Sequence, residues 1–270
     1  MRKFIHLTVA VAICWHITVL HAGAWSNGPS GNTTTNTPSE CTNPPYGTHD
    51  WIADHALSML PDKEKAWLQE YKVYYLLGTE APDNNKIPKE CGVPNQGYDD
   101  RNKGHSVEWS DDWSKMLNDR AAVRAKEEYD KAVNAYNSED YKAAAFYLGA
   151  MAHYVGDVSA YPHSVPYEKF HSKYESWVNK DTDAFDAGKY ESYLKLDKLV
   201  TRKPYEAVKR ISKVTAGGKG KILYPVKMEE LFDEDKDSEM LAESVGLSLN
   251  LGVNELADVL HTFYLNEVSE

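Results

Sequence analysis

Apolar positions recur with the period of an α-helix along most of the chain after residue 46. The periodic segments predict helices at residues 47–60, 63–77, 111–136, 183–194, 204–214 and 239–264, and a central helix that begins at Ser138. Gly78 is a typical helix-ending residue, so we expect the second helix to end there. No block of alternating apolar and polar residues predicts a sheet, and no segment is repeated. The pattern predicts an all-α protein with a single multi-helix domain.

The first 24 residues have the organisation of a signal peptide. Arg2 and Lys3 form a basic end, an apolar core follows, and Ala22-Gly23-Ala24 provides a small-residue cleavage site. An uncleaved membrane anchor is the alternative, but the apolar core is short for a membrane span. We therefore expect an exported protein, extracellular or periplasmic, whose mature domain comprises residues 25–270.

The acidic charge limits the classes of partner. The full chain has a formal net charge of −11, and removal of the signal peptide takes away Arg2 and Lys3 and no acidic residue, which gives −13. Such a chain is not expected to bind nucleic acid or an anionic membrane through a broad basic surface. A substrate phosphate in a pocket is still allowed, because bound cations can supply the local positive charge.

Two cysteines remain in the predicted mature chain. Cys14 lies in the signal peptide, which leaves Cys41 and Cys91. An even pair of cysteines in an oxidising compartment is typical of a disulfide, so we expect these two to be bridged. Asn32 begins an Asn-Thr-Thr sequence, which is a glycosylation acceptor in a eukaryotic secretory pathway.

Histidine and carboxylate residues gather between residues 145 and 175. His153 and Asp157 are four residues apart, as are His171 and Glu175, and His163 lies between the pairs. On a helix each pair points from one face. A single pair is usually a solvated hydrogen-bonded pair, but here two occur close together and the first lies in an apolar stretch. Imidazole and carboxylate are ligands of zinc, so the spacing predicts a metal site.

The same stretch carries a family resemblance. FYLGAMAHYVGDVSAYPHS followed by FHSKYESW resembles the zinc-dependent phospholipase C family, which includes the bacterial phosphatidylcholine-type enzymes and the alpha-toxin catalytic domain. That family is secreted, all-helical, related in fold to the fungal single-strand nucleases, and holds three zinc ions. The resemblance implies one phospholipase C-like catalytic domain at residues 25–270.

The resemblance also implies a complete set of zinc ligands. One ion would be held by Asp83, His105, His153 and Asp157. A second would be held by His163, His171 and Glu175. The third would be held by Trp25, His49 and Asp157, with Trp25 acting through its free amine and carbonyl oxygen once the signal peptide is removed. His55 is not on the face of His49 and is expected to lie at the surface or behind the ligands, and His261 has no acidic partner in a ligand pattern.

The implied activity is hydrolysis of a phosphodiester, most readily the glycerol-phosphate bond of a phospholipid. Clustered zinc ions would bind the phosphate oxygens and lower the pKa of the attacking water. Asp83 would also orient or deprotonate that water, which makes it the expected catalytic residue. Two alternatives are a nuclease of the same fold and a non-catalytic zinc-binding relative. The nuclease is disfavoured by the acidic charge and by Glu175, where those enzymes use Asp.

The headgroup is not predicted. Phosphatidylcholine-cleaving relatives bind choline with an acid and two aromatic residues, and those places hold Gly28, Asn84 and Asn102 here. Compared with the family, residues 26–46 and 84–104 are insertions. The predicted disulfide would tie these insertions together near the metal site. Tyr98, within the second insertion, is one aromatic residue that could replace the missing choline-binding aromatics. The expected substrate is a phospholipid or another phosphodiester, peripheral contact with a membrane is allowed, and no nucleic acid is expected to bind. We also expect a monomer without an added β-sandwich domain.

Overall fold

The computed structural model describes residues 34–94 and 104–269, and this part of the chain is all-helical. It contains nine α-helices. Their bounds are α1 Thr48–Ser58, α2 Asp62–Glu70, α3 Lys72–Glu80, α4 Arg120–Asn137, α5 Tyr141–Asp157, α6 His171–Asn179, α7 Pro204–Gly217, α8 Pro225–Glu234 and α9 Glu239–Phe263. Short 3₁₀ helices are η1 Pro38–Thr42, η2 Lys89–Cys91, η3 Tyr161–His163 and η4 Glu191–Tyr193, and η5 Tyr264–Val268 is a π-helix that follows α9. The all-α prediction is confirmed, whereas the predicted signal peptide lies outside the described residues.

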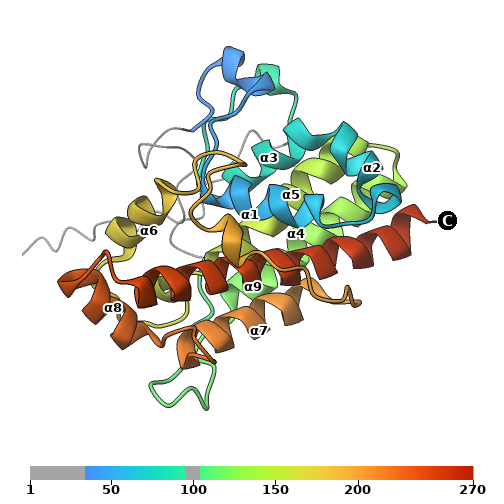
Figure 1. Cartoon of the computed structure of the whole chain (residues 1–270). Helices are drawn as coiled ribbons and strands as arrows, with labels where there is room; N and C mark the ends of the chain where they lie inside the picture. Colours follow the sequence, from blue (N-terminus) through green and yellow to red (C-terminus); the bar gives the residue numbers. More distant parts are fainter. Residues whose placement is uncertain (1–33, 95–103, 270) are drawn as a thin grey trace, which may run out of the picture.

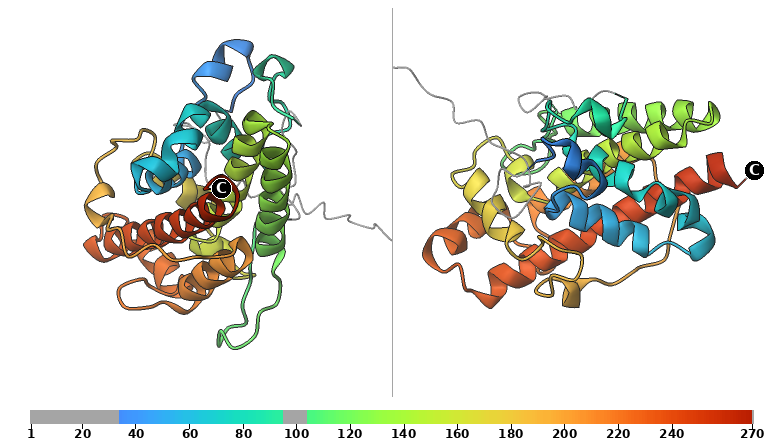
Figure 2. Two further views of the ribbon diagram at one scale, coloured as in Figure 1. Left: turned by 90° about the vertical axis from the view of Figure 1, so that its right-hand side faces the viewer. Right: turned by 90° about the horizontal axis from the view of Figure 1, so that it is seen from above.

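Helix α5 is the centre of the bundle and carries site residues at its C-terminal end. It packs against α1, α3, α4, α7 and α9. Small and apolar residues occupy nearly its whole surface, and all residues from 148 to 157 are buried. Its first turn is capped by the Asp140 side chain, which accepts the Ala143 N–H at 3.1 Å. The long α9 crosses the bundle, with α1, α2 and α3 on one side and α7 and α8 on the other (Figures 1 and 2).

Several predicted helix boundaries are wrong. The helix predicted at 63–77 is two helices, because Tyr71 leaves the helical conformation at φ −102° and ψ 19°. The helix predicted at 111–136 begins only at Arg120, since the Asp112 carboxylate accepts the Ser114 N–H and hydroxyls of Ser110 and Ser114 in a competing turn. That turn belongs to a protruding loop before α4 (Figure 1). Residues 183–194 contain only the short 3₁₀ helix η4, and α8 was not predicted.

Gly78 does not end a helix as expected but brings two helices together. It lies within α3, opposite Gly149 of α5. A Cβ added at Gly78 would lie 2.0 Å from the Phe146 carbonyl oxygen, and one at Gly149 would lie 1.9 Å from the Tyr75 carbonyl oxygen. The pair therefore allows a close helix contact that fixes the C-terminal end of α3 against α5.

Replacing Gly149 by alanine should destabilise the fold. The new methyl group meets backbone atoms, which cannot rotate away, so we expect a loss of about 2–3 kcal/mol and a Tm lower by roughly 5–10 °C. Thermal unfolding followed by circular dichroism measures the effect. Gly188→Ala is the matched control, because its nearest atom would be 3.9 Å away. Equal Tm values for both variants would contradict a tight α3–α5 contact.

The predicted disulfide is present. Cys41 and Cys91 are bonded, with 4.9 Å between their Cα atoms. The bridge joins η1 to η2, which lie in the two segments identified as insertions. In the part of the chain that the structure describes, no helix has the length and apolar character needed to cross a bilayer.

Candidate metal centre

Five buried or half-buried histidines and three carboxylates meet at the C-terminal end of α5. Their ligand atoms form three groups, within each of which the atoms lie within 4.8 Å of one another. The first group is His49, His153 and Asp157. The second group is Asp83, His105 and His153. The third group is His163, His171 and Glu175. These residues come from α1, the segment after α3, the segment before α4, α5, η3 and α6.

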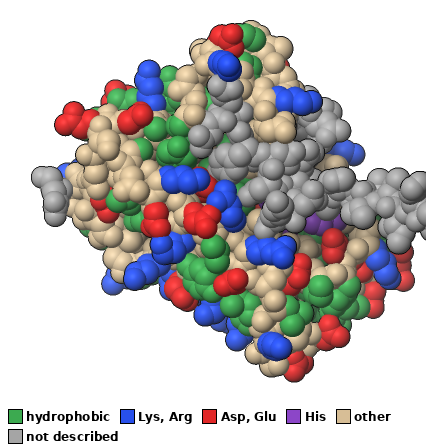
Figure 3. Space-filling view, turned by 180° about the vertical axis from the view of Figure 1, so that it is seen from behind, with side chains coloured by type: hydrophobic (Ala, Val, Ile, Leu, Met, Phe, Trp, Pro, Cys, Tyr) green, Lys and Arg blue, Asp and Glu red, His purple; other side chains and the backbone are tan. Residues whose placement is uncertain are grey.

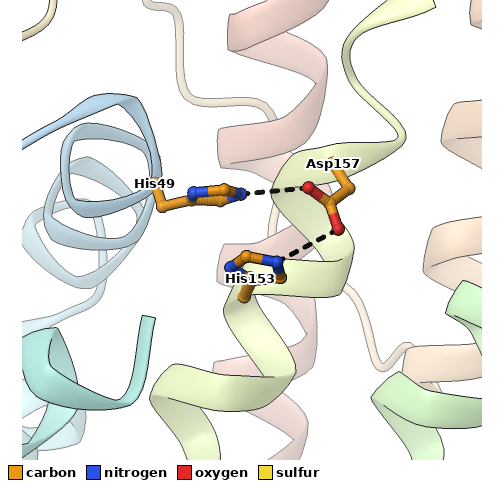
Figure 4. A group of neighbouring side chains, drawn as sticks. All are labelled: His49, His153 and Asp157. Atoms are coloured by element: carbon orange, nitrogen blue, oxygen red, sulfur yellow. Dashed lines mark hydrogen bonds and ion pairs between the residues drawn. The ribbon is translucent and has the colours of Figure 1, made fainter. Parts of the chain in front are cut away.

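Asp157 lies between histidines from three segments. Its Oδ1 is 3.1 Å from His49 Nε2, and its Oδ2 is 2.8 Å from His105 Nδ1 and 3.3 Å from His153 Nε2. Figure 4 shows the two carboxylate oxygens directed to His49 of α1 and to His153 of α5. The His49 and His153 rings are stacked with centroids 3.9 Å apart. One carboxylate thus connects the first and second groups.

Asp83 closes the second group. One of its oxygens, Oδ1, is 3.7 Å from His105 Nε2, and the other, Oδ2, is 4.0 Å from His153 Nε2. His105 is placed by the backbone just after it, where the Val107 N–H donates to the His163 carbonyl at 3.0 Å. The same hydrogen bond links the second group to the third.

The third group combines η3 with the first turn of α6. Glu175 Oε1 is 2.9 Å from His163 Nε2 and 3.1 Å from His171 Nε2. His163 Nε2 also lies 3.8 Å from Asp157 Oδ1, so this group adjoins the first. The i, i+4 spacing of His171 and Glu175 places both side chains on one face of α6, as predicted.

Neighbouring groups orient two of the histidines. His153 Nδ1 lies 2.7 Å from the Thr79 carbonyl oxygen, so this nitrogen donates to the backbone and Nε2 faces the cluster. His171 Nδ1 lies 3.1 Å from Glu168 Oε1, the corresponding arrangement with a carboxylate. Glu168 was not predicted, although its position three residues before His171 places the two side chains close together.

The pKa values reflect a strongly acidic, buried cluster. Burial opposes ionisation of Asp157, but His153, His163 and His105 together hold its pKa well below the usual range. Burial, with His153 beside it, lowers the pKa of His49 to about 4. Burial alone would lower the pKa of His171, but Glu175 and Glu168 raise this pKa to about 10. His171 likewise lowers the pKa of Glu175 against the effect of burial, whereas burial raises the pKa of Asp83. Asp157 and Glu175 are therefore held as anions, which favours a positive charge beside them.

The donor set fits zinc. Asp83 Oδ1 and Glu175 Oε2 are buried and have no hydrogen-bond partner among the described residues. A buried carboxylate oxygen without a partner is costly unless it binds a cation. Imidazole nitrogens and carboxylate oxygens are the usual protein ligands of zinc, together with cysteine. The residues present therefore suit divalent zinc.

The structure brings together eight of the nine predicted ligands. Trp25, the ninth, lies outside the described residues, as do Gly28, Tyr98, Asn102 and the sequon at Asn32.

Asn84 is buried, and its amide donates to the Thr35 carbonyl and to Glu80 at 3.1 Å. His55 was expected either at the surface or behind the ligands. It is buried against Trp51 and Phe185 and lies outside the three groups, so the surface placement is wrong. His261 pairs with Glu64 at 2.6 Å and lies outside the three groups.

Glu80 fixes the segment that leads from the N-terminal region to α1. Its two oxygens accept the Thr35 N–H and the Thr35 hydroxyl, each at 2.9 Å. Burial, followed by the charge of Asp50, raises the pKa of Glu80 to about 8. The native state thus holds a proton that the unfolded chain releases near the unperturbed value of 4.5.

Because of Glu80, the free energy of unfolding should decrease as the pH rises. Below 4.5 both states are protonated, and between 4.5 and 8 only the native state keeps the proton, so the stabilising contribution is lost as pH rises towards 8. The expected slope from Glu80 is up to about 1.4 kcal/mol per pH unit. Urea unfolding at pH 5 and pH 8 should show a flatter dependence for Glu80→Gln than for wild type. The exposed Glu70→Gln is the control, and a slope equal to wild type in both variants would contradict the buried proton.

Comparison with known proteins identifies relatives. The sequence profile of the zinc dependent phospholipase C family matches residues 48–214. The fold is similar to that of alpha toxin from Clostridium absonum, with a TM-score of 0.53, 18% identity and coverage of 83% of this chain and 64% of that one. It is also similar to Clostridium perfringens alpha-toxin from the avian strain SWCP, with a TM-score of 0.50, 17% identity and coverage of 83% and 65%. The chain spans about two thirds of the length of these toxins, and no curated protein matches it.

Proposed function

The chain belongs to the zinc dependent phospholipase C family, and on that premise we propose that it is a secreted phosphodiesterase that cleaves the glycerol-phosphate bond of phospholipids. The observation that carries the proposal is Asp157, whose two oxygens face different histidines and thereby join two candidate metal groups. The third group adjoins them through His163. A closely spaced set of cations is the arrangement that neutralises a phosphodiester on several oxygens.

Three zinc ions are proposed, with the ligands that the family resemblance assigns. Asp83, His105, His153 and Asp157 would hold one ion. His163, His171 and Glu175 would hold the second. His49, Asp157 and Trp25 would hold the third. When bound, zinc would offset the charge on the phosphoryl oxygens and lower the pKa of a water molecule.

The residues of the chain have separate roles in the proposed reaction. Asp83 is the expected base, as the family resemblance implies: in a role separate from holding zinc, its carboxylate would orient or deprotonate the attacking water. Asp157 contributes a full negative charge between the first and second groups. Thr79 and Glu168 hold His153 and His171 in the orientation that directs Nε2 into the cluster.

Export and a monomeric single domain are part of the proposal. The Cys41–Cys91 bridge supports an oxidising compartment, since such bonds are rare in the reducing cytosol. The mature catalytic domain would comprise residues 25–270. Its partners would be phospholipid, with peripheral contact with a membrane and no nucleic acid.

Hydrolysis assays on zinc-loaded protein that starts at Trp25 test the function. We expect release of a phosphomonoester from phospholipid micelles, complete loss with a chelator, and recovery on adding zinc. Single-stranded DNA should remain intact. Cleavage of DNA without cleavage of lipid would instead identify a nuclease, and no turnover of lipid, DNA or a simple aryl phosphodiester would identify a non-catalytic relative.

A further inference from the structure

Glu80, the last residue of α3, is bonded both to the turn that carries Asp83 and to a distant segment. Its carbonyl oxygen accepts the N–H groups of Asp83 at 3.0 Å and of Asn84 at 2.9 Å, which closes the turn. Its carboxylate accepts the Thr35 N–H and hydroxyl, each at 2.9 Å, and the Asn84 amide at 3.1 Å. One residue therefore joins the turn to a segment 45 positions earlier in the sequence.

Asn84 completes the contact between the turn and that segment. Its amide also donates to the Thr35 carbonyl oxygen at 3.1 Å, and its side-chain oxygen accepts the Lys86 N–H at 2.9 Å. Thr35 and Glu80 are fully buried, and Asn84 is 4% exposed. A buried polar network whose members are hydrogen-bonded holds the segments that it joins rigidly. We call Thr35, Glu80 and Asn84 the polar clamp.

The Asp83 carboxylate depends on this turn for its position. Its buried Oδ1 has no hydrogen-bond partner among the described residues. The His105 and His153 nitrogens that face it lie 3.7 and 4.0 Å away, beyond hydrogen-bonding distance. His153, by contrast, is oriented by its own hydrogen bond to the Thr79 carbonyl. The backbone that Glu80 holds therefore sets where the Asp83 carboxylate lies.

The disulfide joins the same two segments at their other end. The chain runs from Thr35 to Cys41 and from Asn84 to Cys91, and the two cysteines are bonded. The turns η1 and η2 lie side by side at the top of the molecule in Figure 1. A small hydrophobic cluster packs the second segment against α3 and α5, and it consists of Leu77, Ala81, Ile87, Cys91, Val93 and Phe146.

The polar clamp is internal support and does not offer a surface to the substrate. On the face drawn in Figure 3, histidine reaches the surface in one small area beside acidic side chains. Thr35 and Glu80 have no exposed surface, and the polar groups of the clamp bond to one another and to the backbone. Both segments are insertions relative to the family, so this support is a feature of the present chain.

We propose that Glu80 and Asn84 are positioning residues, which act through the polar clamp to hold the Asp83 carboxylate in the second metal group. This inference rests on the proposed ligation of zinc by Asp83. The disulfide keeps the clamp assembled, because it prevents the two segments from separating at their other end.

Chelator competition on zinc-loaded protein tests the positioning without a measurement of activity. Asn84→Ala removes the amide that bonds Thr35 and Glu80, so the affinity for one zinc ion should fall by about tenfold or more, as is typical when a residue that orients a metal ligand is lost. The other ions should be retained. Zinc per chain is measured after dialysis against increasing chelator. Asn36→Ala is the matched control, because this exposed amide donates only to the Thr34 hydroxyl among the described residues.

Two substitutions at Glu80 separate positioning from a general loss of stability. Glutamine keeps an oxygen that accepts from Thr35 and Asn84 and gains an amide that donates to the Thr35 hydroxyl, so Glu80→Gln should bind zinc within about twofold of wild type. Glu80→Leu has no polar side-chain atom and should lose the same ion as Asn84→Ala. Thr35→Val removes only the hydroxyl, so its loss should be smaller, and it decides the question if the larger changes prevent folding.

The contribution of the disulfide is tested by the same competition. Replacing both Cys41 and Cys91 by serine should weaken the same zinc ion by less than Asn84→Ala, because the hydrogen bonds of the clamp remain. Circular dichroism establishes that each variant keeps its helical content. Wild-type zinc affinity in the double serine variant would remove the disulfide from the proposal.

Two results would overturn the positioning role. One is wild-type affinity for every zinc ion in the folded clamp variants. The other is an equal loss of all the ions, which would mean that the substitutions disturb the whole metal centre. A wild-type protein that binds no zinc would overturn the positioning role together with the proposed function. If the clamp variants behave as expected but zinc-loaded wild type hydrolyses no phosphodiester, only the proposed function fails.

Discussion

Replacing Asp157 by asparagine should lower phosphodiesterase activity by at least about 100-fold and reduce the zinc content, a larger loss than for Glu175→Gln. Substitution of residues that only support a metal ligand costs 10–100-fold in affinity or activity, so loss of a shared ligand should exceed that range. Asp157 faces His49 with one oxygen and His105 and His153 with the other. An amide provides one acceptor oxygen, an N–H₂ group in place of the other, and no charge.

Glu175→Gln is the matched comparison because it affects one group. Glu175 contacts His163 and His171 within the third group. Metal analysis of the purified variants gives zinc per chain, and a soluble aryl phosphodiester gives activity without dependence on a headgroup. An Asp157→Asn variant that kept its full zinc content would rule out the bridging role. Circular dichroism establishes that both variants remain helical.

Extra residues before Trp25 should remove about one zinc and most of the activity. An α-amino group has an unperturbed pKa near ~8, so a neighbouring zinc readily keeps it deprotonated as a ligand. Inside a longer chain the same nitrogen is an amide and cannot bind. His49 and Asp157 provide the side chains of that ion's proposed site, and zinc in proteins is usually four-coordinate, so a further ligand is needed.

Two otherwise identical proteins test this dependence on export. One starts at Trp25 and the other carries a few additional residues before it. The extended form should keep its helical content while zinc per chain and phosphodiesterase rate both fall. Equal zinc and equal rate in the two proteins would show that Trp25 is not a ligand and would weaken the proposal of three metal ions.

Local sequence was sufficient for the central helix and its paired ligands. The apolar pattern before Asp157 predicts a buried helix, and the i, i+4 spacing fixes His153 and Asp157 on one face of it. The bounds of α1, α7 and α9 were also close to those predicted, because amphipathic periodicity and end signals act within one segment. The same reasoning failed at residues 111–119, where side-chain hydrogen bonds from Asp112 compete with the helix.

The role of Gly78 was predicted wrongly for a different reason. Sequence statistics favour glycine at a helix end, but here the absence of a Cβ is used for contact with Gly149, 71 positions away. Glu168 and the Thr79 carbonyl likewise gained their roles from the position of a histidine ring. The roles of these residues depend on contacts between segments that are distant in the sequence, so local spacing does not predict them.

The sequence by itself determined the all-helical class, the residue types for a zinc site and, through the family resemblance, the order of its ligands. These follow from short-range spacing and composition. Only the tertiary structure decided that His49 and His105 converge on Asp157, that Asp83 faces His105, and that His153 lies between two groups. The physical reason is that packing of α1, α3 and α4 around α5 sets the distances between distant residues, and charge and ligand chemistry depend on those distances.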